Sequence, residues 1–338
     1  MVYGAIDLHT RYSQIRILDA TGAVLGDRRV LTTRERLVAV FAGHGPIQIL
    51  LETGTESEWV AQALEEAGYR VIVADPNFAP MYGDVRRTVK TDRRDVAALA
   101  EANRRGWYRP AYRCSAPQRA LRQVLSARRQ LVSMRSGTIS VIRALLRQEG
   151  YRLPSGDTER LPARFARLAL PPALGTTLTP LVETVAALTA QIATIDTRLQ
   201  QHAANDPVVA RLRSVPGVGL VVALTFRARI DDVGRFASAS QVSAALGLVP
   251  HEASSAERRH RGHITKAGPP ELRSLLVQAA WACWRSRQGQ PLRRWAEAVA
   301  SRRGRRIAIV GLARRLSRIL FAIWRDGTTY RPEVLVAA

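Results

Sequence analysis

The first 112 residues alternate between short apolar runs and segments with turn or helix signals. Strand-like apolar runs occupy residues 3–8, 14–18, 23–30, 46–52 and 69–74. Only turns separate the first three runs, whereas segments with helical spacing, at 33–42 and 56–67, precede the last two. The pattern predicts three meander strands and then alternating helix and strand, which gives a mixed sheet flanked by helices that ends near Tyr112.

The middle of the chain has the pattern of two long amphipathic helices, at 115–150 and 177–203. A proline-rich interruption separates them, and it holds Pro154, Pro162, Pro171 and Pro172. Two such helices joined by a breaker are expected to pair as an antiparallel coiled-coil arm, within one chain or between protomers. We therefore expect a homo-oligomer, either a dimer or a tetramer.

From Asp206 onward the pattern is helical throughout and rich in arginine. A chain of 338 residues is long enough for two or three domains, at ~100–200 residues per domain. We predict three domains: an α/β domain at 1–114, a helical arm at 115–205 and a helical domain at 206–338.

Basic residues far outnumber acidic ones. Lys and Arg total 51 against 28 Asp and Glu, which leaves a net charge of +23 at pH 7. Such an excess favours a polyanionic partner, and nucleic acid is the first candidate. An anionic membrane is the competing partner, but the longest apolar stretches, such as Val218–Phe226, are shorter than the ~20 residues that span a bilayer.

The remaining composition predicts a cytoplasmic protein with no membrane association. An acidic residue, Asp7, lies where a signal peptide would have a basic start and an apolar run. The two cysteines, Cys114 and Cys283, are far apart and lack partners at metal-ligand spacing, so neither a disulfide framework nor a zinc site is expected.

Four carboxylates occupy positions that the expected fold brings together. Three meander strands followed by alternating helix and strand are the order of the ribonuclease H-like fold. Asp7 ends the first strand, and Glu52 ends the strand expected beside it. Asp92 and Asp95 are three residues apart, so on a helix they share one face.

Such a cluster predicts a metal site for phosphodiester chemistry. Closely packed carboxylates repel one another unless hard cations bridge them, and oxygen ligands suit Mg²⁺ or Mn²⁺. Two such ions about 4 Å apart can activate a nucleophilic oxygen and stabilise the leaving one. The alternative is that these acids are solvated surface charges. Lys90, beside the cluster, could offset charge, hold a phosphate or be solvated.

Two glycines in Val215-Pro-Gly-Val-Gly219 have the spacing of a helix-hairpin-helix element. In such an element Gly217 and Gly219 would let backbone N–H groups approach a phosphate without reading sequence. The alternative is an ordinary turn between two helices.

A basic loop between Pro250 and Gly268 carries two serines, Ser254 and Ser255. Its cationic side chains are those of Arg258, Arg259, Arg261 and Lys266. A serine in such a loop could attack a phosphate whose charge the guanidinium groups offset. The loop could equally clamp a phosphate or simply be solvated.

Further along the chain, arginines alternate with tryptophans. We assign Arg305 and Arg306 to nucleic-acid binding and the nearby tryptophans to the core.

Together these segments resemble the DEDD transposases of the IS110 and IS1111 insertion sequences. The resemblance runs nearly end to end, and it is carried by the four acids, Lys90-Thr-Asp-Arg-Arg-Asp95, Pro216-Gly-Val-Gly219, Phe236, Gly247-Leu-Val-Pro250, the serine pair, Ile264-Thr-Lys-Ala-Gly268 and Leu272-Arg273. It implies an N-terminal RuvC-like domain, a helical arm and a C-terminal transposase domain with a serine nucleophile. It also implies a structured noncoding bridge RNA that pairs with target and donor DNA.

Carried over to this chain, the resemblance makes Asp7, Glu52, Asp92 and Asp95 the catalytic and metal-binding acids, and Ser255 the nucleophile. The family commonly has glycine after that serine, whereas this chain has Ala256, which leaves Ser254 as the alternative. We therefore expect a bacterial, nucleoid-associated recombinase that cuts and exchanges double-stranded DNA through a covalent phosphoserine, guided by RNA. The alternatives are a metal-dependent junction nuclease without a serine intermediate and a noncatalytic nucleic-acid-binding protein.

Overall fold

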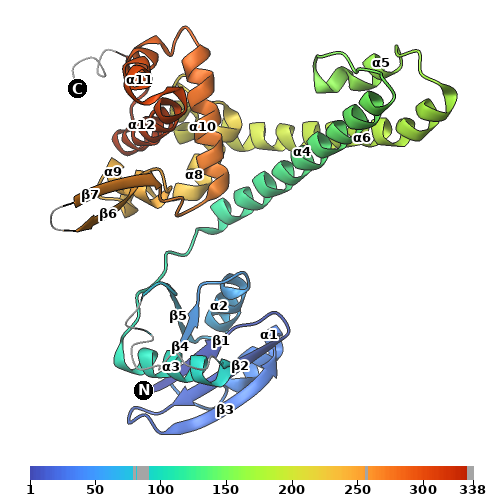
Figure 1. Cartoon of the computed structure of the whole chain (residues 1–338). Helices are drawn as coiled ribbons and strands as arrows, with labels where there is room; N and C mark the ends of the chain where they lie inside the picture. The colour runs from blue at the N-terminus through green and yellow to red at the C-terminus, as the bar shows by residue number, and fades with distance from the viewer. Residues whose placement is uncertain (79–80, 82–90, 256–257, 333–338) are drawn as a thin grey trace. The chain divides into compact units, whose positions relative to one another are not determined.

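A computed structural model describes residues 1–78, 81, 91–255 and 258–332, with two compact units, Met1–Arg113 and Cys114–Ala338 (Figure 1). Each unit is described by itself. The first unit ends next to the predicted boundary at residue 114. The second unit holds both the arm and the C-terminal helices, so the division of this part into two domains stays a prediction.

The first unit is built on a five-stranded mixed sheet in the order β3-β2-β1-β4-β5. Its strands are β1 (Val2–Asp7), β2 (Tyr12–Leu18), β3 (Val24–Leu31), β4 (Ile47–Glu52) and β5 (Arg70–Ala74). Antiparallel pairing joins β1 to β2 and β2 to β3, while β1, β4 and β5 run parallel. The predicted mixed sheet is confirmed, and it is consistent with a ribonuclease H-like domain.

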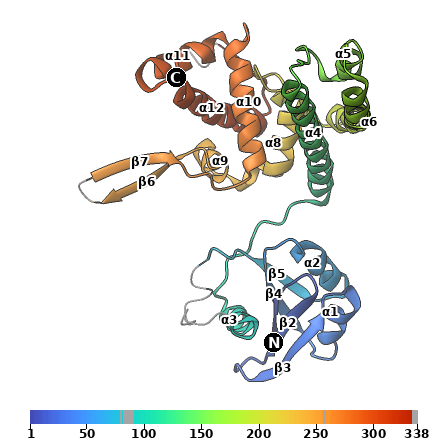
Figure 2. The ribbon, with the colours of Figure 1, turned by 45° about the vertical axis from the view of Figure 1, so that its right-hand side comes forward.

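Helices cover both faces of this sheet, as Figure 2 shows for the lower part of the view. They are α1 (Arg34–Val40), α2 (Ser57–Glu66) and α3 (Asp92–Arg105). Side chains alternate between the faces of a strand, so Ile6 packs in the cluster with α1 and α2, whereas its neighbour Ala5 packs in the cluster with α3. The sheet is therefore the middle layer of three, and α3 is held against one face.

A buried amide fastens α3 to the two central strands. Asn103, only 1% exposed, donates hydrogen bonds to the backbone oxygens of Gly4 on β1 and Gln48 on β4, at 2.8 and 2.9 Å. Its own oxygen accepts from Gln48 Nε2 at 2.6 Å. Since Asp7 ends β1, Glu52 ends β4 and Asp92 begins α3, this one side chain fixes the relative positions of three elements that carry predicted site residues.

Replacing this amide should destabilise the first unit. Asn103→Ala leaves two buried carbonyl oxygens and part of an amide without their partner, and each buried unsatisfied group costs about 1–3 kcal/mol. We expect a loss of about 3 kcal/mol in the free energy of unfolding, measured by urea denaturation. Arg93→Ala, an exposed change on the same helix, is the control and should stay within about 0.5 kcal/mol of the wild type. An equally small loss in Asn103→Ala would mean that the amide does not hold α3.

The second unit begins with a two-helix arm (Figure 1). Its long helices are α4 (Ala116–Gln148) and α6 (Pro172–Ala204), and α5 (Leu161–Phe165) lies in the connection. Arg128 pairs with Asp196 and Arg135 with Thr189, so the two helices run antiparallel within one chain. The predicted intramolecular pairing is therefore what the structure has, although α6 begins earlier than predicted and contains Pro180.

Among the described residues, one helix, α6, has the length and the apolar composition to cross a membrane. Its mean hydropathy is 1.4 over its most apolar stretch. The apolar-run criterion missed it because alanine and threonine separate its larger apolar residues. In the structure it packs along α4 through Val185, Leu188, Ile192 and neighbouring residues.

The rest of the second unit is a helical bundle with one hairpin. Its helices are α7 (Pro207–Leu212), α8 (Leu220–Ile230), α9 (Ala239–Ala245), α10 (Pro270–Arg285), α11 (Gln290–Arg303) and α12 (Arg305–Asp326). The expectation of helix throughout is wrong at the serine loop, where β6 (Pro250–Ser255) and β7 (Arg258–Ile264) pair antiparallel. Within the described residues these two strands form a separate two-stranded sheet, so apolar residues need not alternate along them, which is why the sequence pattern did not predict them.

Candidate functional site

The sheet brings the first two predicted acids to one edge. Ile6 of β1 pairs with Leu51 of β4 in parallel register, so the following residues, Asp7 and Glu52, end adjacent strands on the same side. Both line one cavity of about 230 Å³, together with residues 8–10 and 53–56. The sequence prediction for this pair of strand ends matches the structure.

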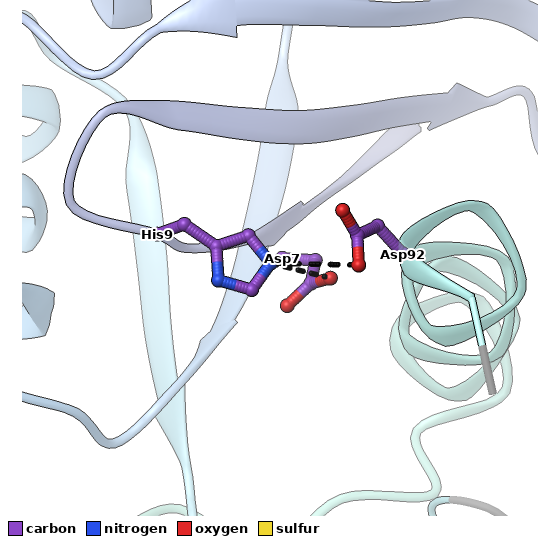
Figure 3. Close-up of side chains that lie close together, drawn as sticks. All are labelled: Asp7, His9 and Asp92. Atoms are coloured by element: carbon purple, nitrogen blue, oxygen red, sulfur yellow. Dashed lines mark ion pairs between the residues drawn. The ribbon is translucent and has the colours of Figure 1, made fainter.

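The third acid reaches Asp7 from α3. Asp92 is the first residue of α3, where the N-terminal end of the helix dipole favours a carboxylate. His9 faces both carboxylates, with its Nε2 3.4 Å from Asp7 Oδ2 and 3.7 Å from Asp92 Oδ1 (Figure 3). One donor atom from each of the three side chains lies within 4.8 Å of the others. The arrangement is a set of two carboxylates and one imidazole that could share a cation.

The charges around Asp7 also favour a cation. Burial raises the pKa of the Asp7 carboxyl above its usual value, and repulsion from Asp92 and Asp95 acts in the same direction, while His9 opposes it. Asp95, one turn along α3 from Asp92, therefore lies close enough to contribute to the potential at Asp7. A divalent ion at this point would relieve both the burial and the repulsion, so the donor set fits a hard metal ion.

Sequence reasoning missed His9. The residue follows the strand-end acid by two positions, in Asp7-Leu-His9, and a single histidine outside a ligand motif carries no signal of its own. Thr32 on the segment after β3 donates its hydroxyl hydrogen to the His9 backbone oxygen at 2.7 Å. The turn that carries the imidazole is thus fixed by a contact that only the folded sheet supplies.

Other predicted residues lie in the second unit or outside the described part. Lys90 lies outside the described residues. Ser255 pairs with Arg258 and Ser254 with Arg259 across the hairpin, and Arg261 pairs with Glu252. Lys266, exposed after β7, has a left-handed backbone with φ of 56°. The two serines hold adjacent positions of β6 and so face different partners in β7.

The two glycines of the predicted helix-hairpin-helix element have different surroundings. Gly217 has φ of 84°, and a methyl group there would lie 2.3 Å from the Ala279 backbone oxygen and 2.6 Å from the Cys283 nitrogen of α10. Gly219 is exposed, caps α8 and has nothing within 4 Å of such a methyl group. Close packing against α10 thus explains why residue 217 is glycine. Gly219 makes no such close contact and leaves the N-terminus of α8 exposed.

Alanine substitutions separate these two roles. Gly217→Ala should destabilise the protein by about 3 kcal/mol or more, because the backbone is left-handed and the turn that holds it must move away from α10. Gly219→Ala should cost less than about 1 kcal/mol, since neither strain nor overlap arises. Thermal unfolding of both variants checks this expectation. Equal stability of the two would contradict the close packing of Gly217 on α10.

The predicted basic positions at the start of α12 are open to solvent. Arg305 and Arg306 follow Gly304 in a fully exposed stretch, and Arg302 and Arg303 end α11 just before them. Arg305 also lies over the Trp284 ring at 6.0 Å. Trp281 and Trp284 pack against the helical core, as predicted, whereas the prediction is wrong for Trp295, which is 36% exposed.

Comparison with known proteins identifies relatives for both units. Residues 5–150 match a family model described as a transposase, and residues 209–296 match the transposase family IS116/IS110/IS902. The transposase for insertion sequence element IS1111A of Coxiella burnetii is 29% identical over 96% of this chain and 90% of its own length. The transposase for insertion sequence element IS1328 of Yersinia enterocolitica is 28% identical over 96% of this chain and 97% of its own length. A transposase of Sinorhizobium fredii is 30% identical over 90% of this chain and 79% of its own length.

These findings confirm the resemblance drawn from the motifs. The first family model is that of a DEDD domain, which implies a divalent metal, and the acidic cluster of Asp7, His9 and Asp92 offers a place for it. The second match covers the helical bundle from α7 to the first part of α11, including the hairpin with the serines. The chain therefore belongs to the IS110 family of insertion-sequence transposases and is an enzyme that acts on DNA.

Proposed function

We propose that this transposase moves its own insertion sequence by RNA-guided cleavage and exchange of DNA strands, through a covalent phosphoserine. The observation that carries the proposal is the meeting of Asp7 and Glu52 in one cavity, with Asp92 beside Asp7. A transposase needs to position a scissile phosphate, and clustered acids do so through hard cations.

Asp7, Glu52, Asp92 and Asp95 would hold the metal, Mg²⁺ or Mn²⁺. When bound, the metal would supply electrostatic stabilisation of the oxygens around the scissile phosphorus. Asp7 is well shielded, with 17% of its side chain exposed, whereas 62% of Asp92 is exposed. The first acid would thus anchor the cation from the protein side, and the second would face the incoming DNA.

Ser255 would be the nucleophile. Its Oγ would attack the scissile phosphorus, form an O–P bond and release a deoxyribose hydroxyl that takes up the serine proton. This exchange conserves the phosphodiester energy, so reversal by a different DNA hydroxyl rejoins the strands without a nucleotide cofactor. Arg258 and Arg259, which pair with the serines in the backbone register of the hairpin, would supply positive charge for the phosphate.

A junction-cutting nuclease is the second candidate from the same site. The cluster around Asp7 and Asp92 lies entirely within the first unit, so it could act without any serine. The two candidates differ in one product, because only the recombinase leaves protein covalently attached to DNA.

A requirement for RNA distinguishes RNA-guided recombination from transposition by the protein alone. The direct experiment is to purify the protein from cells that carry its element, sequence the RNA that copurifies, and test strand exchange with and without it. One structured RNA from the element, required for exchange of matched donor and target DNA, is the expected result. Strand exchange by protein freed of RNA would overturn the guided mechanism.

The arm and the basic surface complete the proposal. We propose that the arm of α4 and α6 joins copies into a dimer or tetramer and that the protein associates with the nucleoid through its charge. The open arginines at the junction of α11 and α12 and the exposed backbone at Gly219 are proposed contacts for nucleic-acid phosphates, as are Lys90, Arg261 and Lys266.

Salt dependence tests the phosphate contacts. Affinity for duplex DNA should fall linearly with the logarithm of salt concentration, and the double variant Arg305→Ala, Arg306→Ala should reduce that slope by about two. The loss should be equal on different sequences, because phosphate contacts carry no base information. Arg34→Ala with Arg105→Ala removes the same charge where Glu66 and Glu101 pair with it, so its slope should not change. A changed target preference in the first variant would argue against backbone contact.

A further inference from the structure

We propose that His9 is a nitrogen ligand of the metal, so that this site prefers Mn²⁺ to Mg²⁺. The inference rests on the metal site of the proposed function and adds a residue outside the four acids. It starts from an imidazole that faces two carboxylates on different elements, the end of β1 and the start of α3 (Figure 3).

The separations are compatible with a shared ion. Ligand atoms about 2.1 Å from one octahedral ion lie about 3 Å apart when adjacent and about 4 Å apart when opposite. His9 Nε2 lies 3.4 Å from Asp7 Oδ2 and 3.7 Å from Asp92 Oδ1. Both distances fall inside this range, and both exceed the usual 2.7–3.2 Å of an N–H···O hydrogen bond.

The local fold holds the imidazole in this position. The backbone oxygen of His9 accepts a hydrogen bond from Thr32 Oγ1, and Thr32 also contacts Ser13 at 2.8 Å. Thr32 N–H donates to the Arg11 backbone oxygen at 3.0 Å as well. The turn from β1 to β2 is thus tied to the end of β3 at His9 and just after it, while 52% of the His9 side chain remains open to an arriving ion.

The ligand type sets the preference among metals. Mg²⁺ strongly favours oxygen ligands and retains several waters, whereas imidazole nitrogen suits transition metals, including those that also accept carboxylates. A site of carboxylates alone would bind Mg²⁺ and Mn²⁺ with similar geometry. Adding one nitrogen ligand raises the affinity for Mn²⁺ relative to Mg²⁺. The ratio of the two affinities therefore shows whether His9 binds the metal.

Pulsed electron paramagnetic resonance of the full chain loaded with Mn²⁺ tests ligation directly. We expect modulation from a directly coordinated ¹⁴N nucleus in the wild type and its loss in His9→Ala. His44→Ala is the matched control, because His44 is a second histidine of the same unit outside the cluster; its signal should persist. Labelling with ¹⁵N-histidine should convert the modulation pattern without any substitution, which keeps the test valid if a variant misfolds.

Competition between the two metals gives the second readout. His9→Ala should weaken Mn²⁺ binding about tenfold and change Mg²⁺ binding less than about threefold. The hydrogen bond from Thr32 uses the His9 backbone, so it survives the substitution. Mn²⁺ bound without nitrogen modulation, or equal losses for both metals, would overturn the role of His9 alone. If the wild type binds neither metal, or Asp7→Ala binds both as the wild type does, the proposed metal site itself is wrong.

Discussion

Asp7→Asn should lower the rate of element recombination by about 10³-fold, because it removes the shielded anionic ligand of the proposed metal site while keeping its shape. Loss of one preorganised electrostatic contact at a reacting centre commonly costs about 10²–10³-fold in rate. Removing an acid from a protein of net charge +23 does not weaken its attraction to phosphates, so DNA and RNA binding should persist. Recombination of a marked element, measured beside a filter-binding assay, checks both expectations.

The matched control for this experiment is Glu66→Gln. Glu66 is an exposed acid at the end of α2 that pairs with Arg34, and a surface pair contributes about 0–1 kcal/mol to stability. Its recombination rate should equal that of the wild type. Chelation of divalent metal by EDTA should reproduce the Asp7→Asn defect. Normal recombination by Asp7→Asn at ordinary metal concentration would remove this acid from the active centre.

Ser255→Ala should eliminate the covalent protein–DNA adduct and with it all recombination. The substitution removes the Oγ that would form the bond to phosphorus, and no neighbouring arginine can replace it. Binding should be almost unchanged, because one hydroxyl contributes about 0.5–1.5 kcal/mol at most against many phosphate contacts. The measurement is trapping on a substrate that carries a nick near the scissile bond, followed by denaturing electrophoresis.

Ser254→Ala is the internal control. The two serines hold adjacent positions of β6 and pair in the backbone register with Arg259 and Arg258 respectively, so we expect only one of them to be the nucleophile. Ser254→Ala should keep the adduct. Loss of the adduct in Ser254→Ala but not in Ser255→Ala would make Ser254 the nucleophile. This is the alternative left by Ala256, which stands where the family commonly has glycine. An adduct that survives the double substitution would exclude a serine mechanism, and nicking without any adduct would favour the nuclease.

Local patterns in the sequence were sufficient to predict the sheet and its acidic edge. The ends of β1 and β4 follow from apolar runs that stop at Asp7 and Glu52, and the fold order puts parallel strands side by side. The spacing of Asp92 and Asp95 placed both on the first turn of α3. These features depend on periodicity and on strand order, both of which one sequence contains.

The missed features depend on contacts between distant segments. Asn103 has the sequence pattern of one more polar residue on an amphipathic helix, yet it binds backbone oxygens about a hundred residues and about fifty residues away. The Pro-Gly-Val-Gly pattern predicted a turn, but only the structure reveals that Gly217 packs on α10. The hairpin of β6 and β7 was not predicted because, within the part of the chain that the structure describes, it forms a two-stranded sheet of its own, and such a sheet requires no alternation of apolar residues.

Loss of the buried Asn103 amide should make the movement of the element sensitive to growth temperature. A loss of about 3 kcal/mol in a unit of this size lowers the melting temperature by about 10 °C or more. Mesophilic domains commonly melt at about 45–65 °C, so a copy that has lost this amide would work in cool cultures and fail in warm ones with every carboxylate intact. An element that stops moving in warm hosts can therefore retain all four acids. Its defect would then lie in α3, the helix that carries Asp92 and Asp95.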